Sequence, residues 1–265
     1  MMGKAWIGKA WMVALVAALP SAWPQPAIAP PQLGFVRDGG SALRPVYGVT
    51  GSFVLGSPLD GKIVSEAFSG SIGLLKTDSS LAVFDSTGKQ LASIDAAGGP
   101  ALFAFSPGGN AALAYIPSSN SLIEWRGSVF APVPAKYEEP DTVLAIAFPT
   151  PLEAALMVQR KDTIWELNLP LAKNGTISQH ALIGVHAPML ALPTGDLVYS
   201  DPEGIVVRRS DATEVHIAAL LPASFSLQQM NENWVQLMDL NSSAQFAIHI
   251  APGREGFYRL PGSPQ

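Results

Sequence analysis

Four histidines are the first residues of this chain that could do chemistry: His180, His186, His216 and His249. An imidazole can ligate a metal or transfer a proton near neutral pH. No pair of them shows the His-x-x-x-His or Glu-x-x-His spacing that directs two ligands at one metal. We therefore interpret all four as surface or sheet-face residues. The sequence predicts no metal ligand and no cofactor.

Ser86 and Lys89 match the Ser-x-x-Lys pattern of some acyl-transfer enzymes. That chemistry needs the serine at the start of a helix, so that the lysine one turn later faces its hydroxyl. Here Asp85-Ser86-Thr87-Gly88 predicts a hairpin turn between two strands, which separates the two side chains. Neither a Gly-x-Ser-x-Gly elbow nor a phosphate-binding glycine loop occurs. We predict no catalytic residue.

The densest group of charges is Lys136-Tyr137-Glu138-Glu139-Pro140-Asp141. Its composition is typical of a solvated connection between two structural units, and we favour that interpretation. The functional alternative is an acidic loop at a rim that binds a cation or a basic partner.

A ten-residue segment occurs twice and indicates the elements that must position these side chains. Ala104–Leu113 aligns with Ala147–Leu156, 43 residues further along the chain. A period of about 40 residues is typical of arrays in which each unit is one small sheet.

Short apolar runs of four to seven residues, separated by Gly and Pro, predict strands throughout. The runs group in fours and predict five four-stranded units. The predicted strands are 63–68, 73–76, 81–84, 90–94; 102–105, 111–116, 122–125, 128–131; 143–148, 154–159, 163–167, 177–183; 189–192, 197–200, 205–208, 214–218; 225–229, 234–238, 245–250 and 256–260. Trp125, Trp165 and Trp234 fall in these strands and are expected to pack in the core.

Units of this kind resemble the blades of a β-propeller, a ring of sheets around a central channel. Phe105-Ser106-Pro107-Gly108-Gly109-Asn110 resembles the Phe-Ser-Pro-Asp-Gly turn of WD-repeat and related bacterial propellers. No Trp-Asp pair closes a third strand and no Gly-His pair opens a unit, so the resemblance assigns no subfamily. It implies an all-β propeller of five to six blades. The alternative from the pattern is a β-sandwich or an irregular stack of sheets.

Within residues 33–56, Phe35-Val36-Arg37-Asp38-Gly39-Gly40 followed by Leu43–Val49 is typical of the third and fourth strands of a unit, and Ser52–Leu55 is a further candidate strand. We favour a partial sixth blade built from them. The alternative is a five-bladed ring with an N-terminal covering strand.

Glu66 is the carboxylate most relevant to a central channel, because it lies in a predicted innermost strand. Its alternation with Val64 and Phe68 also places it on the same side as two apolar residues, so the pattern leaves its role open.

Residues 1–29 have the layout of a secretory signal. Lys4 and Lys9 precede the apolar run 10–19, prolines follow it, and Ala27-Ile28-Ala29 is a small-x-small cleavage site. We therefore expect a single mature domain, residues 30–265, that is exported to the periplasm or the cell exterior. An uncleaved anchor is the alternative, although the run is shorter than the roughly 20 residues of a membrane span.

Charge and composition narrow the class of partner. Two of the 16 basic residues lie in the signal, so 14 remain against 21 acidic residues, a net charge of about −7. This balance argues against nucleic acid and anionic membranes as partners. The chain has no cysteine, which excludes disulfides and thiolate chemistry.

We expect a monomer that binds an unidentified protein or small molecule without catalysis. The alternative, implied by the propeller resemblance, is a hydrolase or lactonase with a divalent metal held by Glu, Asn and Asp in the channel.

Overall fold

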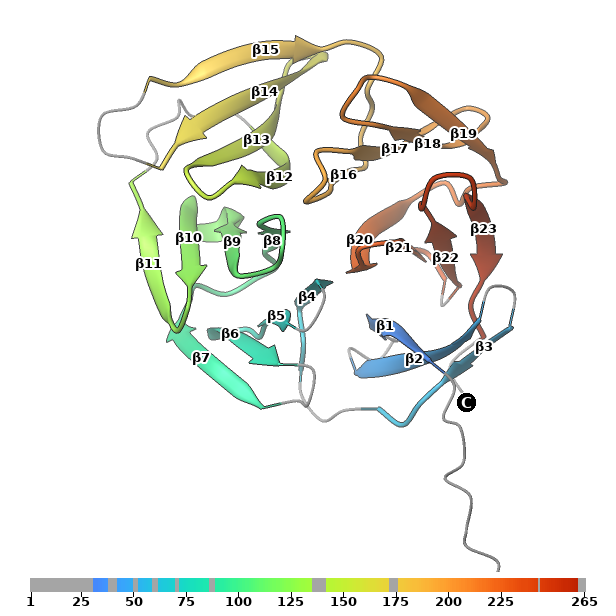
Figure 1. Cartoon of the computed structure of the whole chain (residues 1–265), viewed down its shortest axis with the longest axis horizontal. Helices are drawn as coiled ribbons and strands as arrows, with labels where there is room; N and C mark the ends of the chain where they lie inside the picture. Colours follow the sequence, from blue (N-terminus) through green and yellow to red (C-terminus); the bar gives the residue numbers. More distant parts are fainter. Residues whose placement is uncertain are drawn as a thin grey trace, which may run out of the picture.

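The computed structural model describes residues 31–37, 42–49, 52–58, 62–69, 72–85, 89–134, 142–171, 176–242 and 244–261. Within these ranges the chain forms six antiparallel sheets, arranged like spokes around a common centre (Figure 1). The chain proceeds from one sheet to the next around the ring, and the first and last sheets are neighbours (Figure 1). The structure is therefore a six-bladed β-propeller, and the all-β prediction is confirmed.

Each blade is made from strands that are consecutive in the sequence. Blade 1 contains β1 (Gln32–Arg37), β2 (Leu43–Val49) and β3 (Ser52–Leu55). Blade 2 contains β4 (Ser65–Ser69), β5 (Ile72–Lys76), β6 (Ser80–Asp85) and β7 (Gln90–Asp95). Blade 3 contains β8 (Leu102–Phe105), β9 (Ala111–Ile116), β10 (Ser121–Arg126) and β11 (Val129–Val133), with the short 3-10 helix η1 (Pro117–Ser119) between β9 and β10.

The remaining three blades are built in the same way. Blade 4 contains β12 (Thr142–Thr150), β13 (Glu153–Arg160), β14 (Thr163–Pro170) and β15 (Ser178–Leu182). Blade 5 contains β16 (Met189–Ala191), β17 (Leu197–Asp201), β18 (Gly204–Arg208) and β19 (Glu214–Ala218). Blade 6 contains β20 (Phe225–Asn231), β21 (Trp234–Asp239), β22 (Gln245–His249) and β23 (Gly256–Arg259). All twenty strands expected in the five complete units are present, and their ends differ from the predicted ends by no more than three residues.

Blade 1 has three described strands, and these occupy the second to fourth places of a blade. β1 packs against β20, where the Leu33 carbonyl accepts a hydrogen bond from Asn231 at the end of that strand, and Arg37 at the other end of β1 lies near Glu66 of β4. No described strand of blade 1 takes the innermost place, and the innermost strands of the two adjacent blades, β4 and β20, contact each other directly. The predicted partial sixth blade is confirmed, and the alternative of a single covering strand is wrong.

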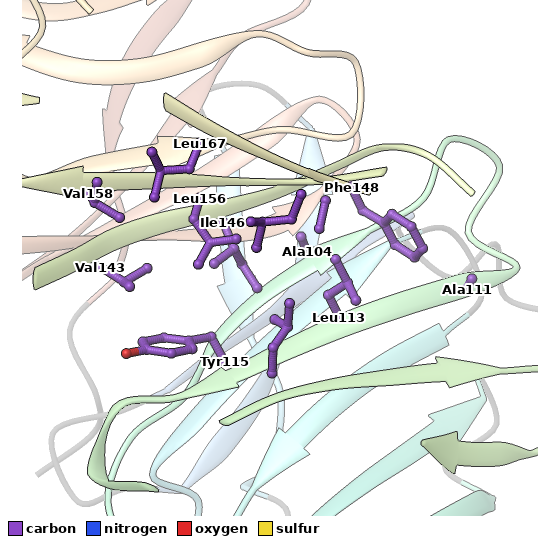
Figure 2. Close-up of a cluster of buried hydrophobic side chains, with 13 residues drawn as sticks. Ala104, Ala111, Leu113, Tyr115, Val143, Ile146, Phe148, Leu156, Val158 and Leu167 are labelled. Atoms are coloured by element: carbon purple, nitrogen blue, oxygen red, sulfur yellow. The ribbon is translucent and has the colours of Figure 1, made fainter. Parts of the chain in front are cut away.

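Apolar contacts between neighbouring blades form the core. Figure 2 shows the cluster between blades 3 and 4, where Leu113 and Tyr115 face Ile146, Phe148 and Leu156. Phe148 is fully buried there, and its counterpart Phe105 is fully buried between blades 2 and 3. The two copies of the repeated segment therefore play the same part: each places its phenylalanine against the blade that precedes it in the ring.

The repeated segment also contains the turn that joins β8 to β9. Ser106 Oγ donates to Asn110 Oδ1 over 2.9 Å and accepts from the Ala111 amide over 3.1 Å. Ser106 is fully buried, so these bonds satisfy a hydroxyl that would otherwise lie unpaired in the core. The segment whose sequence resembles a propeller turn therefore forms the turn between two neighbouring strands of a blade.

Several expectations fall on residues outside the described ranges: the signal segment 1–29, the turn residues Ser86–Gly88, and the acidic segment 136–141. In the part of the chain that the structure describes, no helix is long and apolar enough to cross a membrane.

Candidate functional site: the central channel

The innermost strands of blades 2 to 6 surround a cavity of about 200 Å³ at the centre of the ring. Each of β4, β8, β12, β16 and β20 contributes to its wall, and of the described residues of blade 1 Arg37, the last residue of β1, contributes. The cavity follows from the topology, because each complete blade begins with its innermost strand and so directs that strand toward the axis.

Most of the wall is apolar. Side chains that line it include Leu102, Phe103, Leu144, Ile146, Met189 and Leu227. These residues also pack between the blades or lie half-buried, which fixes the width of the channel. Such a wall favours the binding of an apolar group over that of a strongly hydrated ion.

The polar part of the wall lies at the seam where the ring closes, between β1, β4 and β20. We call Arg37, Glu66 and Gln228 the seam cluster; all three residues line the cavity. Glu66 has 2% of its surface exposed, and neither of its carboxylate oxygens receives a hydrogen bond of normal geometry from a described residue. A buried carboxylate without full hydrogen bonding is costly, so its presence at a cavity wall points to a function there.

The guanidinium of Arg37 is the charged neighbour of Glu66. Arg37 Nε lies 4.0 Å from Glu66 Oε2, too far for a hydrogen bond, and Arg37 Nη1 donates instead to the Val64 carbonyl. The backbone of Arg37 is held from the other side, where Gln245 Nε2 donates to its carbonyl over 2.7 Å. Arg37 is therefore held near Glu66 without donating a hydrogen bond to its carboxylate.

Burial dominates the titration of Glu66. Desolvation raises its pKa from 4.5 to about 7, although the charge of Arg37 and the side chain of Gln228 lower it in part. Near neutral pH the carboxyl group is therefore present in both protonation states. The site can offer a charged acceptor or a neutral carboxylic acid, which donates as well as accepts.

A second buried charge lies away from the channel. Lys76, at the end of β5, is fully buried, and its ammonium donates to the Thr77 carbonyl. Burial lowers the pKa of Lys76, and the charge of Asp78 opposes that shift. Lys76 does not line the cavity, so we assign it no part in the site.

The histidines do not converge. His180 Nε2 lies 3.4 Å from Glu166 Oε2 on blade 4, and His216 Nδ1 lies 3.1 Å from Asp201 Oδ2 on blade 5. His186 is exposed in a loop, and His249 stacks on Trp234 with ring centroids 4.4 Å apart. Among the described residues, no three His, Cys, Asp or Glu side chains form a group that could hold a metal.

The tryptophans pack as predicted. Trp125 and Trp234 are buried in contacts between blades, and Trp165 is partly buried against the cluster of blades 3 and 4.

The sequence drew attention to Glu66 but not to its two neighbours. Arg37 is an ordinary strand end in the sequence, and Gln228 is one of two glutamines in β20. Both lie near Glu66 because β1, β4 and β20 meet where the ring closes. The cluster has one carboxylate, one guanidinium and one amide, and no nucleophile paired with a base among the described residues lining the cavity. It can therefore bind and orient a ligand, and it lacks the arrangement of an acyl-transfer site.

Comparison with known proteins supports the fold. No protein-family model and no curated protein matches the chain in sequence. The structure is similar to one in a nidogen/laminin complex, with a TM-score of 0.55, 9% identity, and coverage of 86% of this chain and 92% of that one. It is also similar to TolB from Acinetobacter baumannii, with a TM-score of 0.57, 14% identity, and coverage of 87% of this chain and 63% of TolB. This chain thus spans less than two thirds of TolB.

A WD-type propeller is also among the similar structures. The C-terminal WD40 domain of Sif2 matches with a TM-score of 0.44 and 13% identity, over 89% of this chain and 72% of that domain. At these identities the likeness concerns the fold alone. The propeller part of the resemblance is confirmed by the six sheets arranged around a common centre, and no family is assigned.

Proposed function

We propose that this chain is an exported, non-catalytic β-propeller that binds a small molecule in its central channel. The observation that carries the proposal is the cavity of about 200 Å³, apolar over most of its wall and polar at the seam cluster. A concave apolar pocket with a few convergent polar groups is the usual form of a small-molecule site. A cavity of about 150 Å³ can accommodate benzene, so this channel has room for a ligand of one ring or a short chain.

The test is a thermal-shift screen of the full chain against a chemically diverse small-molecule library, followed by calorimetry on the hits. A ligand of the native state must raise its stability. Ser226→Phe, on the cavity wall, should fill the channel and weaken the hits at least tenfold. Ser128→Phe, in the exposed turn between β10 and β11, is the matched control and should leave them unchanged. Hits that bind equally well to both variants would place the ligand on a face of the ring and contradict the proposal.

Export is supported by the layout of residues 1–29. Expression of the full chain in a bacterial host, followed by N-terminal sequencing of the secreted fraction, should give a first residue at Pro30. A product that keeps Met1 and stays in the cytoplasm would contradict export.

No observation favours the metal-dependent hydrolase. The channel wall has Glu66 as its single carboxylate among the described residues, whereas the propeller hydrolases that the resemblance implies use several oxygen ligands. Calcium or zinc should therefore leave the midpoint of thermal unfolding unchanged. A rise in the midpoint of thermal unfolding that is lost in a Glu66 variant would support the hydrolase instead.

A further inference from the structure

The proposed channel site also indicates a class of ligand. We propose that the channel takes a small uncharged molecule with an apolar body and at least one N–H donor, of which a primary carboxamide is the simplest example. The inference rests on the proposed function, and it is carried by the seam cluster.

The first step is the charge of the site. Glu66 and Arg37 are the charged residues lining the cavity in the described part of the chain, and they have opposite signs. An ammonium ligand would place a second cation beside the Arg37 guanidinium, and a carboxylate ligand a second anion beside Glu66. In each case the attraction to the residue of opposite charge is offset by repulsion from the other residue, 4.0 Å away, and the ion also loses its hydration. A neutral head group avoids either repulsion.

The second step is the need for a donor. Neither oxygen of Glu66 receives a hydrogen bond of normal geometry, although the Gln228 side chain is close enough to lower its pKa, and an ionised carboxylate can only accept. A ligand N–H group would satisfy one of the two oxygens. A primary amide adds a carbonyl acceptor, which suits the neutral carboxylic acid form of Glu66 and the donors of Gln228. The same head group therefore fits both protonation states.

The third step is access. The two Glu66 oxygens expose almost no surface in this structure, so binding requires the side chain to turn toward the cavity that its residue lines. That turn breaks no hydrogen bond of normal geometry and gives up only the interaction with Gln228 and the Arg37 contact of 4.0 Å. Ligand binding can therefore recruit the carboxylate at small cost.

The fourth step is the apolar body. Opposite the seam, the wall consists of residues such as Leu102, Leu144 and Met189 from β8, β12 and β16. A saturated ring or short branched chain would replace water against these side chains, and burial of that surface favours binding.

The experiment uses calorimetry on the full chain with four probes that share a cyclohexane ring. They are cyclohexanecarboxamide, its N,N-dimethyl derivative, cyclohexylammonium and cyclohexanecarboxylate. We expect the primary amide to bind at least tenfold tighter than the N,N-dimethyl amide, which lacks the N–H donor, because a hydrogen bond to a charged acceptor is worth about a factor of ten or more. The two ions should bind more weakly than the primary amide.

Variants of Glu66 test whether this residue causes the preference for the primary amide. Glu66→Leu removes both acceptors, and the ratio between the two amides should fall below about threefold. Glu66→Gln keeps one acceptor oxygen and should keep part of the preference, which guards against a fold defect in the leucine variant. Glu203→Leu, at an exposed glutamate in the turn between β17 and β18, is the control and should leave the ratio unchanged.

The outcomes separate this inference from the proposed function. If the four probes bind equally well in the channel, or if cyclohexylammonium binds tightest, the ligand class is wrong and channel binding stands. An amide preference that persists in Glu66→Leu would also overturn the assignment. If neither these probes nor any library compound binds, both proposals are wrong.

Discussion

Arg37 and Glu66 lie across the closure of the ring, with Arg37 Nε 4.0 Å from Glu66 Oε2. The two residues are 29 positions apart in the sequence and belong to neighbouring blades, blade 1 and blade 2. They meet where β1 and β20 contact β4, and both line the central cavity there. A buried carboxylate therefore lies at the closure of the ring, where loss of hydration disfavours its ionised form.

Stability should fall as pH rises toward neutrality because of Glu66. Its pKa is about 7 in the folded chain and 4.5 is its ordinary value. Between these values the folded state holds a proton that the unfolded state has released, so the free energy of unfolding decreases with rising pH and levels off above pH 7. The full effect corresponds to about 3 kcal/mol.

Urea unfolding of the wild type and Glu66→Gln at pH 5, 6, 7 and 8 measures this effect. The difference between the two proteins isolates Glu66, because other titrations, including that of Lys76, are common to both. We expect Glu66→Gln to gain stability relative to the wild type as pH rises. Glu203→Gln, at an exposed position, should follow the wild type. A difference between wild type and Glu66→Gln that does not change from pH 5 to pH 8 would contradict the raised pKa.

Gly34 should be essential for packing blade 1 against blade 6. Its φ is +150°, and a Cβ added there would lie 2.7 Å from the Met230 carbonyl oxygen of β20. Gly34→Ala therefore adds a clash to a strained backbone, and we expect a loss of about 2 kcal/mol or more in the free energy of unfolding. Faster proteolysis within blade 1 should accompany the loss.

Gly99→Ala is the control for that variant. Gly99 also has a positive φ, +93°, but a Cβ there would meet no atom within 4 Å. It carries the backbone strain alone, about 1 kcal/mol. Equal losses for the two variants would mean that the contact with Met230 has no effect on stability.

The blades could be predicted from the sequence because their determinants are local. β8, β9 and β19 have the predicted ends: β8 and β9 are short apolar runs, β19 alternates polar and apolar residues, and turn residues flank them. Phe105 and Phe148 marked the repeat, and both proved to be core residues. Patterns of this kind lie within about ten consecutive residues, so they can be recognised from the sequence alone.

The seam cluster could not be predicted in the same way. Glu66 alternates with apolar residues, and that pattern is equally consistent with a channel residue and a buried one. Its neighbours Arg37 and Gln228 are far from it in the sequence and meet it only through ring closure. Nothing local marks the three-stranded form of blade 1 in the described residues, or the way ring closure brings these side chains together.

Arg209 should be a strong link between blades 5 and 6. Its Nη1 lies 3.1 Å from Asp196 Oδ2, and its Nη2 lies 2.7 Å from Glu255 Oε1 in the next blade. All three side chains are less than 15% exposed. Arg209→Met would leave two partly buried carboxylates without their cation, and we expect a loss of about 2 to 4 kcal/mol, by urea unfolding.

Arg126→Met provides the comparison for Arg209. Arg126 pairs with Glu124, but its side chain is 51% exposed. Exposed pairs contribute about 1 kcal/mol or less. The link between blades 5 and 6 would be unimportant if the two methionine variants unfolded at the same urea concentration.

Phe105→Ala and Phe148→Ala should cost similar amounts of stability, because the two side chains occupy equivalent places in successive blades. Both are fully buried, Phe105 between blades 2 and 3 and Phe148 between blades 3 and 4. Removing a buried phenylalanine ring usually costs about 3 to 5 kcal/mol, which includes the cavity left behind. Urea unfolding of both variants measures the losses, and Leu152→Ala, at a side chain that is 70% exposed, should cost less than about 0.5 kcal/mol. In a ring where each blade packs on the one before it, the two losses should agree within about 1 kcal/mol, within the spread found at fixed chemistry. A large loss at one phenylalanine and none at the other would show that the repeated segments do not play the same structural role.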